Sequence, residues 1–261
     1  MGRKDSFVAG ILFIISAPSG SGKSTLVNAL RSQVGGLDFS ISWTTRPPRG
    51  SEQSGREYHF TSRKDFEAMR DAGEFLEYAE VFGNYYGTAR RSLEEASAAG
   101  RDLLLDIDVQ GARQVVEKLP EAVTIFVAPP NPKVLRTRLR NRSRAEGHVD
   151  EQVLFRRLSE ASKEIENCQQ YRYILVNDVL ERAVAQLEAI VVVERILQSG
   201  GEIDLEHRRD FEIAQSCQQQ NARERLQPVL DAFGIGKHGS EQRNLFLEET
   251  DEPGEPQGSK N

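Results

Sequence analysis

Residues 11–25 read Ile-Leu-Phe-Ile-Ile-Ser-Ala-Pro-Ser-Gly-Ser-Gly-Lys-Ser-Thr, so an apolar run passes directly into a loop of small residues. The apolar run predicts a buried strand of a parallel sheet, and the small residues let the backbone wrap around an anion. A helix that begins near Lys23 would turn its positive N-terminal end toward the same anion. The spacing is typical of a phosphate-binding loop, although Ala17 stands where that motif has its first glycine. We expect that this position needs no positive φ.

The loop predicts binding of a nucleoside triphosphate together with Mg²⁺. Lys23 would bridge the β- and γ-phosphates, and the Ser24 hydroxyl would hold the metal ion. A second apolar run ends at Asp106, which would hold the Mg²⁺ shell through water; the alternative is an aspartate that caps the next helix. The residues assigned to the triphosphate are Ala17, Pro18, Ser19, Gly20, Ser21, Gly22, Lys23, Ser24 and Thr25.

Composition restricts the class of protein. The 261 residues are 38% hydrophobic and carry a formal net charge of −6, so bulk charge does not favour a nucleic-acid partner. Cys168 and Cys217 stand far apart and form no C-x-x-C pair, which favours a reducing cytoplasm. No apolar stretch approaches the roughly 20 residues that span a bilayer, so we expect no membrane partner.

Strand and helix patterns alternate along most of the chain. Apolar runs near residues 11–15, 102–107, 123–127 and 173–176 predict buried parallel strands separated by amphipathic helices. We therefore predict an α/β fold of the P-loop NTPase type, with helices on both faces of a parallel sheet. The predicted domain spans residues 7–198, with a core at 7–38, 89–131 and 168–198, an insertion at 39–88 and a helical lid at 132–167.

The insertion and the C-terminal part differ from this core. The insertion is rich in Pro, Gly and aromatic residues, which predicts a small mixed sheet of its own, with residues 39–45 as one strand. Ser62 and Asp65 form a capping box for a helix over residues 63–72. Residues 199–235 predict a partly helical extension. Residues 236–261 are polar and acidic, which predicts a disordered tail.

Two further groups in the insertion could carry chemistry. Arg46 and Arg49, stiffened by prolines, suit a second anion because guanidinium forks bind phosphate in bidentate fashion. Many surface loops also carry Arg and Pro, so a structural interpretation stays open. Glu77 and the two consecutive tyrosines Tyr85 and Tyr86, taken alone, are more typical of structural residues in a small sheet.

Basic residues gather on the predicted lid. The helix over residues 132–144 carries no acidic residue, and Arg138 and Arg142 lie four apart on one face. Arg157 follows on the next helix. Such arginines suit a mobile lid over a transferring phosphoryl group, and the alternative is a solvated helix face.

Taken together, these segments resemble the guanylate kinase family over residues 8–197. The motifs occur in that family's order and spacing, and the Ala17 variant resembles one that its bacterial members carry. The segments are Ser16-Ala-Pro-Ser-Gly-Ser-Gly-Lys-Ser-Thr25, Ser42-x-Thr-Thr-Arg-x-Pro-Arg49, Gly55-Arg-Glu-Tyr-x-Phe60, Gly83-Asn-Tyr-Tyr-Gly-Thr88 and Leu105-Asp-Ile-Asp-Val-Gln-Gly111.

The resemblance implies phosphoryl transfer from ATP to GMP with Mg²⁺, and it implies a role for each matching residue. The GMP phosphate would be held by Arg46, Arg49, Tyr58 and Tyr86. The guanine base would be read by the side chains of Ser42, Glu77, Thr88 and Asp108. The charge between the two nucleotides would be neutralised by Lys23, Arg46, Arg138, Arg142 and Arg157.

Two questions stay open at this stage. Scaffold proteins contain guanylate-kinase-like domains that bind phosphopeptides without catalysis, and they resemble the same fold. The phosphate loop, the Asp106–Asp108 pair and the lid arginines favour the enzyme over this alternative. The sequence leaves a homodimer or a higher homo-oligomer open, and it does not assign a role to the extension.

Overall fold

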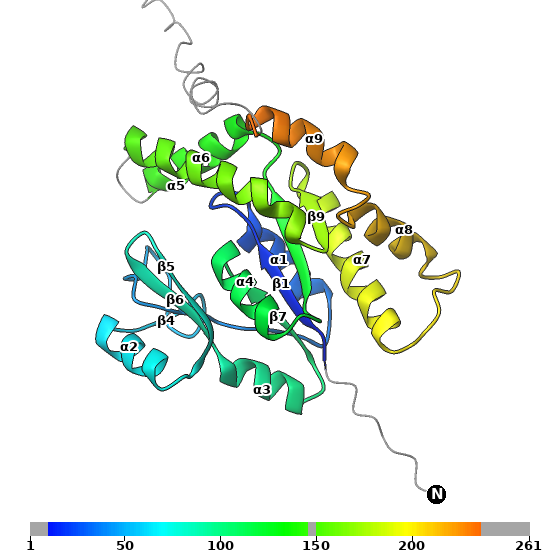
Figure 1. Ribbon diagram of the computed structural model, residues 1–261, viewed down its shortest axis with the longest axis horizontal. Coiled ribbons are helices and arrows are strands. Elements are labelled where there is room, and N and C mark those ends of the chain that lie inside the picture. Colours follow the sequence, from blue (N-terminus) through cyan, green and yellow to red (C-terminus); the bar gives the residue numbers. More distant parts are fainter. Residues whose placement is uncertain (1–9, 146–149, 236–261) are drawn as a thin grey trace, which may run out of the picture.

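A five-stranded parallel sheet lies at the centre of the computed structural model, which describes residues 10–145 and 150–235 (Figure 1). The strand order is β2-β7-β1-β8-β9, and every neighbouring pair is parallel. This confirms the predicted sheet. The strands are β1 (Leu12–Ser16), β2 (Leu37–Phe39), β7 (Asp102–Asp106), β8 (Val123–Ala128) and β9 (Tyr173–Val176).

Helices cover both faces of this sheet, because side chains that alternate along each strand are apolar in both directions. Phe13 and Ile15 face one apolar cluster, and Leu12 and Ile14 face the other. The first cluster includes side chains of α1 (Lys23–Gln33), α7 (Leu180–Gln198) and α8 (Arg208–Cys217). The second includes α3 (Arg90–Ala98), α4 (Val109–Lys118), α5 (Pro132–Ala145), α6 (Glu151–Glu166), the 3₁₀ turn η1 (Asn167–Gln170) and α9 (Arg223–Ala232).

The insertion forms a second, mixed sheet with the order β4-β3-β6-β5. Strand β3 pairs with β4 in parallel and with β6 in antiparallel fashion. The strands are β3 (Trp43–Thr44), β4 (His59–Phe60), β5 (Phe75–Val81) and β6 (Asn84–Ala89). Helix α2 (Arg63–Asp71) begins as predicted, because the Ser62 hydroxyl accepts a hydrogen bond from the Asp65 backbone N–H at 3.1 Å.

The prediction of a single strand over residues 39–45 is wrong. Phe39 ends β2 and pairs with Leu104 in the larger sheet, whereas Trp43 begins β3 in the smaller one. The Ser40 backbone N–H still donates to the Leu104 carbonyl at 3.1 Å, so the chain leaves the larger sheet just after this residue. Hydrophobic alternation continues across the junction, and for that reason the pattern shows no boundary.

Helices α5 and α6, in the range predicted to form a lid, lie between strands β8 and β9 in the chain. Asn131 caps α5, since its side chain accepts from the Val134 backbone N–H at 2.9 Å. Asp150 caps α6 by accepting from the Gln152 N–H at 2.8 Å. Leu135, Leu139 and Leu158 then bury both helices in the core cluster.

The C-terminal extension packs onto the larger sheet. Gln218 forms an antiparallel bridge with Tyr173, and the Gln219 backbone N–H donates to the Arg172 carbonyl at 3.0 Å, so the extension pairs with the edge strand β9. Cys217 and Phe233 are fully buried, on opposite faces of the sheet. The predicted tail, residues 236–261, and the first three residues of the predicted domain, 7–9, lie outside the described residues.

Within residues 10–145 and 150–235, no helix combines the length and the apolar character that crossing a membrane requires.

Because Phe233 is buried with side chains of α6, we predict that Phe233→Ala lowers the free energy of unfolding by about 3–5 kcal/mol. Urea denaturation followed by circular dichroism measures this. Leu205→Ala is the control, since Leu205 is 87% exposed and its loss should change stability by less than about 0.5 kcal/mol. Equal, small effects of both substitutions would show that the extension does not contribute to the core.

Candidate active site

The phosphate loop connects β1 to α1 in a conformation that requires glycine. Gly20 and Gly22 have φ values of 89° and 88°, in the left-handed region. A Cβ at Gly22 would also come within 2.5 Å of the Asn177 side-chain nitrogen. Ala17 needs no such conformation, as expected, because Phe82 is the single non-glycine residue with positive φ in the described part of the chain.

Two side chains from elsewhere in the fold hold this loop in place. The Asn177 amide donates to the Ser21 carbonyl at 2.7 Å, and Arg138 donates to the same carbonyl at 3.1 Å. Arg138 also donates to the Asn177 carbonyl at 3.2 Å, so the lid helix α5 contacts the loop directly. The Ser21 hydroxyl is buried without a hydrogen-bond partner, so one polar atom of the loop is unsatisfied in this arrangement.

Lys23 and Asp106 form the charged pair at the carboxyl edge of the sheet. The Lys23 Nζ lies 2.5 Å from the Asp106 Oδ1 and donates to the Ile107 carbonyl at 3.0 Å. The two residues follow β1 and end β7, which are neighbouring strands. Burial lowers the pKa of Lys23, but Asp106, with smaller contributions from Tyr58 and Asp108, raises it, so the net pKa is raised and the ammonium stays charged.

The second group of residues predicted to bind an anion lies in the insertion. The Arg46 side chain is 6% exposed. Its Nη2 donates to both oxygens of the Glu52 carboxylate, at 2.9 and 3.1 Å, and its Nη1 donates to the Pro47 carbonyl at 2.7 Å. The same carboxylate accepts from the Arg49 backbone N–H at 2.8 Å. Arg46 also lies 5.3 Å from the centre of the Tyr58 ring, and the Tyr58 and Tyr86 rings meet edge to face at 5.9 Å. These four predicted phosphate ligands therefore lie within one group, around a carboxylate.

A buried carboxyl group lies beside them. Glu77 is 4% exposed, and the Thr88 hydroxyl donates to its Oε1 at 2.6 Å. A Cβ on Gly111 would lie 2.4 Å from the Glu77 Oε2 and 3.4 Å from the Asp108 Oδ1, so both carboxylates flank the start of α4. Burial, then the Asp108 charge, raises the pKa of Glu77 to about 7. Ser42 directly precedes β3, where Trp43 pairs with Gly87, which places it next to Thr88 along the sheet.

Asp108 has the helix-capping role that was considered for Asp106. Its Oδ1 accepts from the Gly111 backbone N–H at 2.8 Å, and β7 has already ended at Asp106. Asp108 can cap the helix and also take part in the site, because the cap uses one carboxylate oxygen and the carboxylate lies near Glu77.

The phosphate loop and the group around Arg46 lie close to each other. Burial raises the pKa of Tyr58, and the Asp106 charge raises it further, while Lys23 opposes this. These effects need the insertion sheet to lie close to the phosphate loop. From the lid, Arg138 reaches that loop, Arg157 lies over the Phe82 ring of the insertion, and the Arg142 side chain is exposed on α5.

Comparison with known proteins agrees with this geometry. The family model for guanylate kinase matches residues 10–194, which is well over half of the chain. The chain belongs to the guanylate kinase family. The guanylate kinase of Koribacter versatilis is 58% identical over 226 residues, covering 87% of this chain and 97% of that protein. That of Cupriavidus metallidurans is 48% identical over 192 residues, covering 74% and 87%.

A solved guanylate kinase supports the same assignment. The crystal structure of guanylate kinase from Anaplasma phagocytophilum is 33% identical, with a TM-score of 0.60, and the match covers 72% of this chain and 87% of that one. The 226 residues shared with the Koribacter guanylate kinase cannot fit within residues 1–198, so that relative shares part of the extension.

The site of this guanylate kinase family member fits a Mg²⁺ ion that comes with a nucleotide. Mg²⁺ prefers oxygen ligands and usually takes only one or two from the protein, the rest being phosphate and water. Ser24 and Asp106 supply such oxygens at the loop, and Ser24 is exposed there. Within the described ranges, no group of three or more His, Cys, Asp or Glu side chains is arranged to hold a metal ion.

Sequence reasoning missed several residues of this site. Asn177 directly follows β9, so it could have been found by the rule that picked out Asp106, a polar residue after a buried strand. Glu52 gave no signal, since it is one acid among many in a polar loop. Glu164 of α6 was also missed; burial, then the Asp108 charge, raises the pKa of its carboxyl to about 8, against the opposing effect of Lys23.

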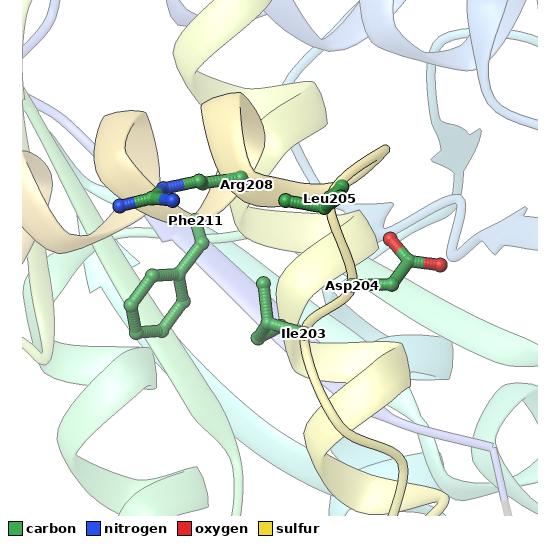
Figure 2. Close-up of a pocket in the computed structure, with 5 residues that line it drawn as sticks. All are labelled: Ile203, Asp204, Leu205, Arg208 and Phe211. Atoms are coloured by element: carbon green, nitrogen blue, oxygen red, sulfur yellow. The ribbon is translucent and has the colours of Figure 1, made fainter.

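A small pocket of about 350 Å³ lies elsewhere, between α7 and α8. Figure 2 shows the Phe211 side chain of α8 beside the Ile203 side chain of the connecting loop, both below Leu205 and Arg208. None of the predicted site residues lines it, and it lies outside the matched family region. It is a feature of the extension and not of the site.

The raised pKa of Glu77 predicts a specific pH dependence of stability. Because the folded chain holds this proton up to about pH 7 and the unfolded chain only to about 4.5, the contribution is present below pH 4.5 and is lost as the pH rises to about 7. We expect a loss of up to about 3 kcal/mol in the free energy of unfolding over this window.

Urea denaturation at several pH values measures that loss, with Glu77→Gln as the matched variant. Between pH 4.5 and 7 the wild type should steadily lose stability relative to the Glu77→Gln variant. A difference that does not change over this range would contradict a raised pKa.

Proposed function

We propose that this protein transfers a phosphoryl group from ATP to GMP, which gives ADP and GDP, with Mg²⁺ bound to the triphosphate. One observation carries the proposal above the others. A buried carboxyl, Glu77, lies between the Thr88 hydroxyl and the Asp108 carboxylate, on the side of the site where a second nucleotide would place its base. The family membership supports a nucleoside monophosphate kinase in general.

The carboxyl pair suits guanine and not adenine. Guanine offers donors at N1 and at the 2-amino group, which Glu77 and Asp108 can accept. Its O6 acceptor suits the hydroxyls of Ser42 and Thr88. Adenine lacks the 2-amino group and reverses the donor and acceptor pattern at position 6, so AMP would leave buried polar groups unpaired.

The GMP phosphate would take the place of the Glu52 carboxylate. That carboxylate supports the proposal, because the Arg46 Nη2 already holds both oxygens of an anionic group at this place. A dianionic phosphate would compete for the same guanidinium. Arg49, Tyr58 and Tyr86 would complete its hydrogen bonds.

Binding of the triphosphate would break the ion pair between Lys23 and Asp106. Residues 17–25 would bind the phosphates through backbone N–H groups, and Lys23 would turn to the β- and γ-oxygens. Asp106 and Ser24 would then hold Mg²⁺, in the case of Asp106 through water. When bound, Mg²⁺ neutralises charge on the oxygens of the transferring group.

Transfer itself would need positioning and charge neutralisation. The acceptor phosphate is already an anion, so no general base is required. Lys23 and Arg46 lie on either side of the place where the phosphoryl group would cross. Arg138, Arg142 and Arg157 would add positive charge from the lid. In this scheme residues 39–88 bind GMP, residues 132–167 act as the lid, and residues 7–198 make up the enzyme domain.

Turnover tests the proposal directly. ADP release with ATP and GMP, measured with a coupled assay, should depend on GMP, and Lys23→Ala should lower kcat by about 10²–10³-fold or more, because it removes a charge from the phosphate site. Lys64→Ala, an exposed lysine on α2, is the control and should leave kcat unchanged. A wild-type protein that binds phosphopeptides but shows no GMP-dependent turnover would favour the phosphopeptide-binding alternative.

Base selectivity tests the role of the buried carboxyl. Glu77→Ala should raise KM for GMP and reduce the preference for GMP over AMP by about 10²-fold or more, because guanine donors would lose their acceptor. The KM for ATP should change little, which a parallel titration of ATP checks. An unchanged preference in a folded variant would exclude Glu77 as a base-reading residue.

A further inference from the structure

The turn between β5 and β6 has an unusual residue for its shape. Val81 pairs with Asn84, so the loop consists of two residues, Phe82 and Gly83. Their φ values are 50° and 78°, both positive. Two positive φ values are the mark of a type I′ turn, which favours Asn-Gly. Asn or Gly is favoured at the first position because a larger side chain is disfavoured in the left-handed region.

Phe82 is therefore a large apolar residue at a position where the backbone conformation disfavours one. The side chain is also exposed to water. Its side chain is 47% exposed, so core burial does not explain it. In the described chain it is the single non-glycine residue with positive φ. Strained positions of this kind persist where a surrounding contact or a function holds them.

The contact that holds the ring comes from the lid. The guanidinium carbons of Arg156 and Arg157 lie 5.3 and 5.8 Å from the centre of the Phe82 ring. Both distances lie within the range of cation–π attraction. Arg157 is half-buried and Arg156 is exposed, so Arg157 is the one that faces inward. Figure 1 shows the β5–β6 turn directed toward the lid helices α5 and α6.

This contact joins the two parts of the molecule that would carry the two substrates. The β5–β6 hairpin also carries Glu77, Tyr86 and Thr88, whereas α6 belongs to the lid. A ring on the hairpin that attracts guanidinium groups on the lid would favour the arrangement in which the lid arginines lie against the second nucleotide. The alternative to such a role is a chance contact between a surface phenylalanine and two flexible arginine side chains.

We propose that Phe82 is a positioning residue for phosphoryl transfer: its ring holds Arg157 of the lid over the acceptor side of the site. The inference rests on the proposed function, in which Arg157 neutralises charge on the transferring group. Phe82 does not touch the reacting atoms, and its effect passes through the arginine. The unfavourable turn conformation is maintained for this contact and not for the hairpin itself.

The test distinguishes the effect of the aromatic ring from the effect of the turn conformation. Phe82→Asn keeps the turn and suits its backbone better, so the melting temperature should stay or rise. The same substitution removes the ring, so kcat should fall by about 3- to 30-fold, the range that a cation–π contact gives. KM for GMP should change less than twofold. Phe82→Tyr should retain kcat, and Phe82→Leu, which keeps apolar bulk without a π face, should lose it.

Two further variants complete the test. Glu80→Gln, an exposed change on the same hairpin, should leave kcat unchanged. In an Arg157→Gln background, Phe82→Asn should lower kcat by less than twofold, because the cation through which the ring acts has been removed.

The outcomes are distinguishable. A Phe82→Asn variant with wild-type kcat would overturn the inference, as would an equal loss with and without Arg157, while wild-type turnover of GMP would leave the proposed function standing. A lowered melting temperature together with an equal loss in Phe82→Tyr would assign the residue to the hairpin alone. A wild-type protein without GMP-dependent turnover would contradict the proposed function, and the inference would fall with it.

Discussion

The contact between Lys23 and Asp106 is the constraint on which the rest of this site depends. It is possible because β1 and β7 are parallel neighbours, so their carboxyl ends reach the same edge of the sheet. At that edge the chain turns through Gly20 and Gly22 into α1, which brings backbone N–H groups and a helix N-terminus to the same point. The charge of the half-buried Lys23 is balanced by the Asp106 carboxylate while no ligand is bound. When a nucleotide binds, a phosphate can take the place of Asp106 beside Lys23, and a metal ion can take the place of Lys23 beside Asp106. The net charge of the site then changes little.

The acceptor side follows a similar logic with its own sheet. Arg46 is balanced by Glu52, and Glu77 lies buried near Asp108 with a raised pKa. The Arg46 charge is thus paired before a second nucleotide arrives, and the raised pKa lowers the cost of burying Glu77. A mixed sheet suits this task, because adjacent short strands bring side chains from residues 42, 77 and 88 to one place, although they are far apart in the chain.

Local chemistry explains what could be predicted from the sequence. The apolar run before the loop, the glycines within it and the Ser62 cap of α2 depend on neighbouring residues, and the structure agrees with each. What could not be predicted depends on distant contacts. The boundary between β2 and β3 is set by the Phe39–Leu104 pairing, and Glu52 finds Arg46 through the shape of a loop. The apolar residues of the extension do not show which part of the fold its helices pack against, so the burial of Phe233 in the cluster that includes α6 could not be predicted. In the same way, Phe82 reads as an ordinary hairpin residue until its φ and its arginine neighbours are known.

A crystal structure of the protein with GMP and Mg²⁺–ADP would test the central claim most directly, since the claim is one of placement. The account predicts guanine between Glu77 and Asp108, the GMP phosphate on Arg46 in place of Glu52, and Lys23 turned from Asp106 to the β-phosphate. GMP bound at another place, with the Arg46–Glu52 and Lys23–Asp106 pairs both intact, would contradict it.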